Sequence, residues 1–210
     1  MQTMDRRVRR TRRLLGEALI ALALEKGYEN LTVHDVTDRA DIGYRTFFRH
    51  YADVDELLLD VVHETRDRLK ELLELAGPFG TTKDACLEAG RNGEIMFRFV
   101  QENQDIFRVI LLGRGMRFCL APIIEHARGQ AASMMSRFSG QGIPVEIAAN
   151  HLVSSMFSLM RWWLANDMAY SPAKMGAIAA ELVVQPTWCA LGERDEPKIV
   201  EVGDMGGVIP

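Results

Sequence analysis

The chain has 210 residues, a mass of 23.7 kDa and a formal net charge of −4. This length allows one or two compact domains with a hydrophobic core. No apolar run approaches the roughly 20 residues that span a bilayer, and no apolar signal segment follows the basic N-terminus. We therefore expect a cytoplasmic protein with no membrane partner. The three cysteines, Cys86, Cys119 and Cys189, show no CxxC spacing and are expected to be free thiols in a reducing compartment.

Positive charge is concentrated at the N-terminus. Residues 1–51 hold ten Lys/Arg and seven Asp/Glu, whereas residues 52–210 hold fifteen and twenty-two. Six arginines and one acid lie within the first thirteen residues. A basic arm on an acidic body is typical of a protein that contacts a polyanion at one end, although charge alone fits a solvated, disordered tail equally well.

The first predicted element in chain order is an amphipathic helix. Its apolar residues recur at helical spacing from Leu14 to Leu22, and Gly27 ends it. A short helix follows over residues 33–40, where Thr32 is placed to cap the N-terminus and Asp35 to complete a capping box. These features predict a longer helix followed by a short one.

A tight turn over residues 41–43 comes next, and Gly43 is the residue there that takes a positive φ without steric cost. A second short helix is predicted over residues 44–51. Two short helices around a tight turn have the spacing of a helix-turn-helix, in which the first helix braces the second and the second lies in the major groove.

The two faces of this motif differ in chemistry. The inward positions are apolar: Val33, Val36, Ala40, Ile42, Phe47 and Tyr51. The outward positions of the second helix are Arg45, Thr46, Arg49 and His50, with Tyr44 and Phe48 at the flanks. Arginine can donate two hydrogen bonds to a guanine edge, and cations that reach phosphates make binding salt-sensitive. A DNA-binding surface is expected here, although an exposed helix with a solvated polar face has the same pattern.

The rest of the chain is predicted to be helical. Asp53 caps a long helix to about residue 75, and a Gly-Pro-Phe-Gly segment at residues 77–80 breaks the chain. Later helices are predicted over residues 82–101, 104–112, 119–138, 144–166 and 172–185. Pro186 is expected to end or kink the last one. The sequence shows no convincing strand, so the predicted fold class is all-α. The tail at residues 192–210 is predicted to be disordered.

The segment LTVHDVTDRADIGYRTFFRHYADVDELL resembles the DNA-binding signature of the TetR family of transcriptional regulators. The resemblance covers about residues 11–60. It implies an N-terminal three-helix helix-turn-helix domain with a basic arm at residues 1–52. It also implies a C-terminal helical domain for effector binding and dimerisation at residues 53–191.

The resemblance also implies roles for single residues. Thr32 would contact a phosphate and His34 would reach a base or a phosphate. Tyr44, Arg45 and Thr46 would lie at the groove, and Phe48 and His50 would face the DNA backbone.

Three positions depart from the family pattern. The usual Tyr is Phe48, the usual Lys is Val54, and the usual Gly at the start of the turn is Asp41. The first two changes remove phosphate contacts. We hypothesise that Arg45, Arg49 and the N-terminal arginines compensate electrostatically.

For the body, the resemblance implies a homodimer through the last two helices and a small-molecule effector inside. Apolar stripes in the predicted helices 144–166 and 172–185 are compatible with such a dimer. A largely apolar or aromatic effector would be lined by Met and aromatic residues, which are equally typical of an ordinary core. The candidate lining residues are Met96, Phe99, Phe107, Phe118, Met134, Met156, Met160 and Trp162.

The predicted function is a homodimeric repressor that binds a palindromic double-stranded DNA operator and is released by a small-molecule effector. The five histidines are scattered, and the sequence shows no metal-spaced cluster, nucleophile motif or glycine-rich phosphate loop. We therefore expect no metal, no cofactor and no catalytic residue. An enzyme built on the helical body and an adaptor whose helix-turn-helix contacts protein are the alternatives.

Overall fold

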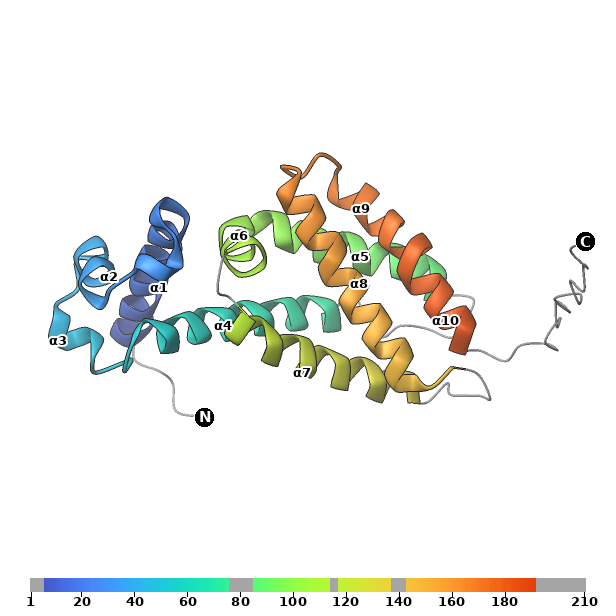
Figure 1. The fold of residues 1–210 in the computed structure, drawn as a ribbon, viewed down its shortest axis with the longest axis horizontal. Helices are drawn as coiled ribbons and strands as arrows, with labels where there is room; N and C mark the ends of the chain where they lie inside the picture. Colours follow the sequence, from blue (N-terminus) through green and yellow to red (C-terminus); the bar gives the residue numbers. More distant parts are fainter. Residues whose placement is uncertain (1–5, 76–84, 114–116, 137–142, 192–210) are drawn as a thin grey trace, which may run out of the picture.

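The computed structural model describes residues 6–75, 85–113, 117–136 and 143–191, and every regular element in these ranges is helical. Helices α1 to α3 form a head at one end of the molecule, α4 leads from the head into the body, and α5 to α10 make up the body (Figure 1). The predicted all-α fold class is confirmed. The expected disordered tail at 192–210 and the break at 77–80 lie outside the described residues.

The first helix, α1, spans Arg6–Lys26 and buries a stripe of Leu and Ala side chains. Gly27 follows it with a φ of 83°, a backbone conformation that glycine adopts without a Cβ clash, so the predicted helix end is confirmed. From Arg6 onward the basic segment is part of this helix, so the alternative of a disordered tail is wrong for these residues. A 3-10 helix, η1 (Tyr28–Asn30), connects α1 to α2.

The second helix, α2, spans Val33–Ala40 and begins with the predicted capping box. The Thr32 hydroxyl accepts from the Asp35 amide at 3.2 Å, and the Asp35 carboxylate accepts from the Thr32 amide at 2.9 Å. The turn after α2 differs from the prediction. Asp41 takes the left-handed conformation with φ 53°, whereas Gly43 has an ordinary φ of −59°.

The third helix, α3, is shorter than the predicted helix over residues 44–51. Its α-helical part spans Tyr44–Phe47, and the chain continues in tighter turns in which the Arg49 amide donates to the Thr46 carbonyl and the His50 amide to the Phe47 carbonyl. Residues 48–50 therefore extend the helix irregularly, and their side chains are spaced differently from those of a continuous α-helix.

The long helix α4 spans Val54–Leu75 and begins with Asp53, whose carboxylate accepts from the Glu56 amide at 2.8 Å. The predicted body helices are confirmed to within a few residues where the structure describes them. Their bounds are α5 (Ala85–Glu102), α6 (Gln104–Leu112), α7 (Arg117–Met135), α8 (Val145–Ala165) and α9 (Pro172–Ala179). None of the described helices is long and apolar enough to cross a membrane.

Pro186 does not end the last helix, so the first of the two predicted outcomes, an end or a kink, is wrong. A π-helical turn over Ala180–Val184 joins α9 to α10 (Gln185–Leu191), and Pro186 lies inside α10. The wider turn has the Gln185 amide donating to the Ala180 carbonyl. The Thr187 hydroxyl donates to the Val183 carbonyl at 2.6 Å. These bonds satisfy backbone groups around a proline that has no amide hydrogen.

One apolar cluster runs from the head into the body. It joins buried residues of α1, α2 and α4 to buried residues of α5, α6, α8 and α9. A second cluster lies among α7, α8 and the segment from Ala180 to Leu191. Helices α5 and α9 approach each other through two glycines, since a Cβ at Gly93 would lie 2.9 Å from the Gly176 Cα. A larger residue at Gly93 or Gly176 would therefore push α9 away from α5.

Candidate DNA-binding surface and effector pocket

The helix-turn-helix has the predicted apolar interior. Val36 and Phe47 are fully buried, and Tyr51 is 5% exposed. The Phe47 ring lies 5.8 Å from the Tyr51 ring, between centroids. Phe47 is the last residue of α3, and its burial fixes which side of α3 faces outward.

The outward side brings together the residues that the sequence assigned to DNA. Arg45 and Arg49 are exposed, Tyr44 is 56% exposed and Phe48 is 47% exposed. The Tyr44 and Phe48 rings meet edge to face at 5.0 Å. Thr46 and His50 are partly buried at the margins. The face thus combines two cations with an exposed aromatic pair, which has the chemistry to contact phosphates and base edges.

Thr32 and His34 have other partners in this structure. The Thr32 hydroxyl donates to the Asp35 carboxylate at 2.6 Å, so a phosphate would have to compete for its single donor. The carboxylate of Asp38 lies 3.0 Å from Nδ1 of His34, and both side chains are exposed. Thr32 is therefore placed first of all as a helix cap, and its predicted phosphate contact stays a prediction, as does the role of His34.

The three departures from the family pattern have separate structural consequences. Asp41 supplies the left-handed residue of the turn. Phe48 presents an exposed ring without a hydroxyl. Val54 begins α4 and packs against the apolar cluster of the head. The proposed compensation by arginine therefore depends on which arginines stay accessible.

Most N-terminal arginines are exposed, whereas the Arg12 side chain is only 32% exposed. Arg6, Arg9 and Arg10 are exposed on the first turns of α1, and exposed Arg13 pairs with Glu17 one turn later at 2.7 Å. The partly buried Arg12 forms an ion pair with Asp60 of α4. Sequence reasoning counted Arg12 with the basic arm, and local spacing carries no signal for a partner 48 residues away.

Arg12, Tyr51 and Asp60 form a closed hydrogen-bond network. The Arg12 Nε donates to the Tyr51 hydroxyl at 3.1 Å and to the Asp60 Oδ2 at 3.0 Å, and the Tyr51 hydroxyl donates to the same Oδ2 at 2.6 Å. Burial and the hydrogen bond to Asp60 raise the pKa of Tyr51 well above its ordinary value of 10. Tyr51 therefore stays a neutral hydrogen-bond donor. It links the end of the reading segment, which is residues 44–51, to α1 and α4.

The candidate effector-lining residues are mostly packed in the core. Met96, Phe107, Met156 and Met160 belong to or pack against the cluster that reaches the head, and Met134 packs against the second cluster. Phe99 is 2% exposed, and its ring lies 6.1 Å from the Phe107 ring, between centroids. The Phe118 side chain lies outside the described residues. Their role as effector ligands stays a prediction.

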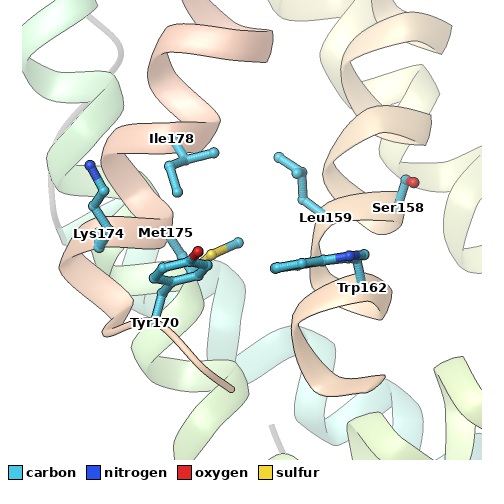
Figure 2. A pocket seen from close by; sticks show the side chains of 7 residues that line it. All are labelled: Ser158, Leu159, Trp162, Tyr170, Lys174, Met175 and Ile178. Atoms are coloured by element: carbon cyan, nitrogen blue, oxygen red, sulfur yellow. The ribbon is translucent and has the colours of Figure 1, made fainter. Parts of the chain in front are cut away.

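An open pocket of about 560 Å³ lies on the outer side of α8 and α9, and of the candidate lining residues only Trp162 borders it. The Trp162 and Tyr170 rings stack across it with centroids 6.2 Å apart, while Lys174 lies at its edge (Figure 2). The other lining residues are Ser158, Leu159, Met175 and Ile178. The sequence did not predict this pocket, since its residues come from two helices and the turn between them.

The apolar stripes assigned to the dimer contact need correction. Ala148, Trp163, Met175, Ala179 and Val183 are each less than 5% exposed within a single chain, so they pack the body. Of the stripe residues, Leu182 is exposed, and the other large apolar side chains left exposed on α8 and after it are Ile147, Trp162 and Tyr170. Trp188 is 7% exposed and belongs to the second cluster.

No group of His, Cys, Asp and Glu in the described ranges is arranged to hold a metal ion. The model of the tetR family of bacterial regulatory proteins matches residues 15–61, which include α2 and α3. An uncharacterized HTH-type transcriptional regulator of Haemophilus influenzae is 25% identical over 190 residues, which are 87% of this chain and 90% of that protein. The match extends well beyond the head.

Solved structures share the fold over most of the chain. A TetR-family transcriptional regulator of Syntrophomonas wolfei superposes with a TM-score of 0.73 at 13% identity, over 86% of this chain and 96% of that one. FadR of Bacillus subtilis, in complex with stearoyl-CoA, superposes with a TM-score of 0.68 at 15% identity, over 82% and 97%. These structures show the fold, and the matches to the tetR-family model and to the HTH-type regulator identify the chain as a TetR-family, DNA-binding transcriptional regulator.

Proposed function

We propose that this regulator is a homodimeric repressor that binds a palindromic operator and leaves it when a small effector binds the body. The observation that carries the proposal is the outward face of α3, where exposed Arg45 and Arg49 lie beside the aromatic pair of Tyr44 and Phe48. The chain is proposed to act without catalysis. Because its target is DNA, its place of action is the cytoplasm.

Within the DNA contact, Arg45 is the base reader. A bidentate arginine–guanine pair is worth about 1–3 kcal/mol against a wrong base. Arg49 and the exposed arginines at the start of α1 bind phosphates, which position the head and make affinity salt-dependent. His50, Thr46 and Phe48 contact the backbone or groove at the margins, and Thr32 and His34 add contacts at the start of α2.

The proposed dimer forms through the outer side of α8 and the segment that follows it. Leu182 is 65% exposed, Ile147 59% and Trp162 48%, and a monomer rarely leaves several such side chains in water on neighbouring elements. The pocket that Trp162 and Tyr170 border lies on the same face, so we assign it to the partner subunit (Figure 2). Two-fold symmetry then places the two α3 helices about 34–36 Å apart, one turn of DNA.

The proposed effector is largely apolar. Support comes from the Met and Phe side chains gathered in the cluster that α6, α8 and α1 share, and from the fold shared with a regulator solved with stearoyl-CoA. A ligand that inserts among Met96, Phe107 and Met156 must displace α6, which packs against α1 of the head. A coupling of about 1.4 kcal/mol between the two sites lowers DNA affinity tenfold.

The deciding experiment measures binding to DNA that flanks the chain's own coding region, by fluorescence anisotropy over a salt series. We expect a specific complex that weakens steeply with salt, and Arg45→Ala should relax base preference while Arg49→Gln reduces the salt slope by about one. Binding that is absent, or independent of salt, would contradict the proposal.

The effector part has a separate test. Adding palmitoyl-CoA or stearoyl-CoA to the complex is expected to release the DNA and to raise the thermal midpoint, with free coenzyme A as the matched control. If none of the apolar compounds tested releases the DNA, the chain binds DNA but is not regulated by an apolar effector.

A further inference from the structure

The head is attached to α4 by polar contacts at two places. On the inner side, Asp60 of α4 accepts from both Arg12 and Tyr51. On the outer side, the Tyr28 hydroxyl of η1 donates to Asp55 of α4. The two attachments differ in burial, because Tyr51 is 5% exposed whereas the Tyr28–Asp55 bond lies at the surface.

The inner attachment constrains the reading segment more than the outer one. Tyr51 ends that segment, and its amide donates to the Phe47 carbonyl at 3.0 Å, so moving Tyr51 moves α3. The hydroxyl occupies both of its hydrogen-bonding roles within the network, accepting from Arg12 and donating to Asp60. Any rotation of the head on α4 would separate the Tyr51 hydroxyl from Arg12 and Asp60. A partly buried charged group would then lack this hydrogen-bond partner, which costs free energy.

The polar atoms of the three groups bind one another. Tyr51 faces the interior of the head, away from Tyr44, Arg45 and Phe48, which are exposed. The guanidinium of Arg12 binds the Asp60 carboxylate, so its charge is already matched. A contribution of these residues to DNA binding has to act through the orientation of α3.

We propose that Arg12, Tyr51 and Asp60 are positioning residues that fix α3 against α4, so that operator affinity depends on the Tyr51 hydroxyl although this group does not contact DNA. The inference rests on the proposed DNA-reading role of α3. It assigns to this network the task of holding the head at the angle to the body that the operator requires.

The test compares Tyr51→Phe with the wild type on a duplex that the wild type enriches from a random-sequence pool. Phenylalanine keeps the buried ring and removes only the hydroxyl. We expect affinity to fall roughly tenfold at every salt concentration, with an unchanged salt slope, because no phosphate contact is lost. Unchanged affinity would overturn the proposal, and so would a slope reduced by about one, which marks a phosphate ligand.

Tyr28→Phe is the matched control, since it also removes a tyrosine–aspartate bond between head and α4 but at the surface. Its affinity should change less than threefold. Asp60→Asn serves as a second variant and should resemble Tyr51→Phe. If Tyr28→Phe weakens binding as much as Tyr51→Phe, the network has no special role and the proposal fails.

Hydrogen exchange tests the positioning role without DNA. In Tyr51→Phe, the amides of Arg49, His50 and Tyr51 should exchange at least tenfold faster than in the wild type, while α8 amides serve as the internal reference. Unchanged exchange would overturn the inference. A wild type that enriches no duplex would refute the proposed function, and the exchange measurement would still decide whether the network orders α3.

Discussion

The contact between α5 and α9 leads to the sharpest stability prediction. A Cβ at Gly176 would lie 2.4 Å from the Glu94 amide nitrogen and 2.8 Å from the Gly90 carbonyl oxygen. An ordinary contact begins at 3.4 Å, so Gly176→Ala forces a shift of about 1 Å, and the obstructing atoms are backbone. Overpacking of this kind costs about 3 kcal/mol, while alanine gains about 1 kcal/mol in helix propensity.

We therefore expect Gly176→Ala to lower the free energy of unfolding by about 2 kcal/mol. For a chain of this size that is a fall in the thermal midpoint of about 4–8 °C. Gly90→Ala is the matched control on the facing helix, since a Cβ there meets nothing within 4 Å. It keeps the propensity gain and should raise the midpoint by about 2–4 °C.

Differential scanning fluorimetry at one fixed protein concentration measures both variants, because association also shifts the midpoint. Opposite signs for the two alanines would support the close approach of α5 and α9. If Gly176→Ala were as stable as Gly90→Ala, the two helices would be farther apart than described, and the packing argument would be refuted.

Three further predictions concern the dimer, the turn and acid stability. Leu182→Glu should give a monomer in sedimentation velocity, because it places a charge in the proposed interface. Leu75→Glu, at an 85% exposed site on α4, is the control and should stay dimeric. Equal behaviour of the two variants would refute the assigned face. Asp41→Gly should raise the unfolding free energy in urea by about 1 kcal/mol, because φ is positive there, and a loss would mean that the Asp41 side chain is needed. Lys26 and Thr32 hold the pKa of Asp35 well below its ordinary value, so its contribution is present above about pH 4 and is lost as the pH falls. The stability gap between the wild type and Asp35→Asn should thus narrow between pH 4 and 2, and a gap independent of pH would contradict this.

Local chemistry made the head predictable. The capping box of Thr32 and Asp35, the bounds of α2 and the burial of Phe47 and Tyr51 all follow from residues within one or two turns of each other. The same local signals predicted α6 with its observed bounds, Gln104–Leu112. The prediction failed within the turn, where glycine was expected at the positive φ, because aspartate also tolerates that conformation.

Contacts between distant segments were not predictable from spacing. In the sequence, Arg12 is one of six arginines near the N-terminus. Its ion pair with Asp60 of α4 distinguishes it from the others. The face of α8 that stays exposed was likewise misassigned, because a helix covered on several sides has apolar residues all around it. Trp163 and Trp162 are neighbours in sequence, yet one is fully buried and the other is 48% exposed.

The π-helical turn before Pro186 keeps the apolar residues of the last helices in phase. The buried positions Met175, Ala179, Val183, Thr187 and Leu191 recur every four residues. In an ideal α-helix each such step overshoots a full turn by about 40°, so the stripe would wind away from the body. One wide turn at Ala180–Val184 takes up part of this overshoot and keeps Leu191 in the second cluster. Deleting one residue within it would rotate everything beyond by about 100° and bring Cys189 toward the core in place of Trp188.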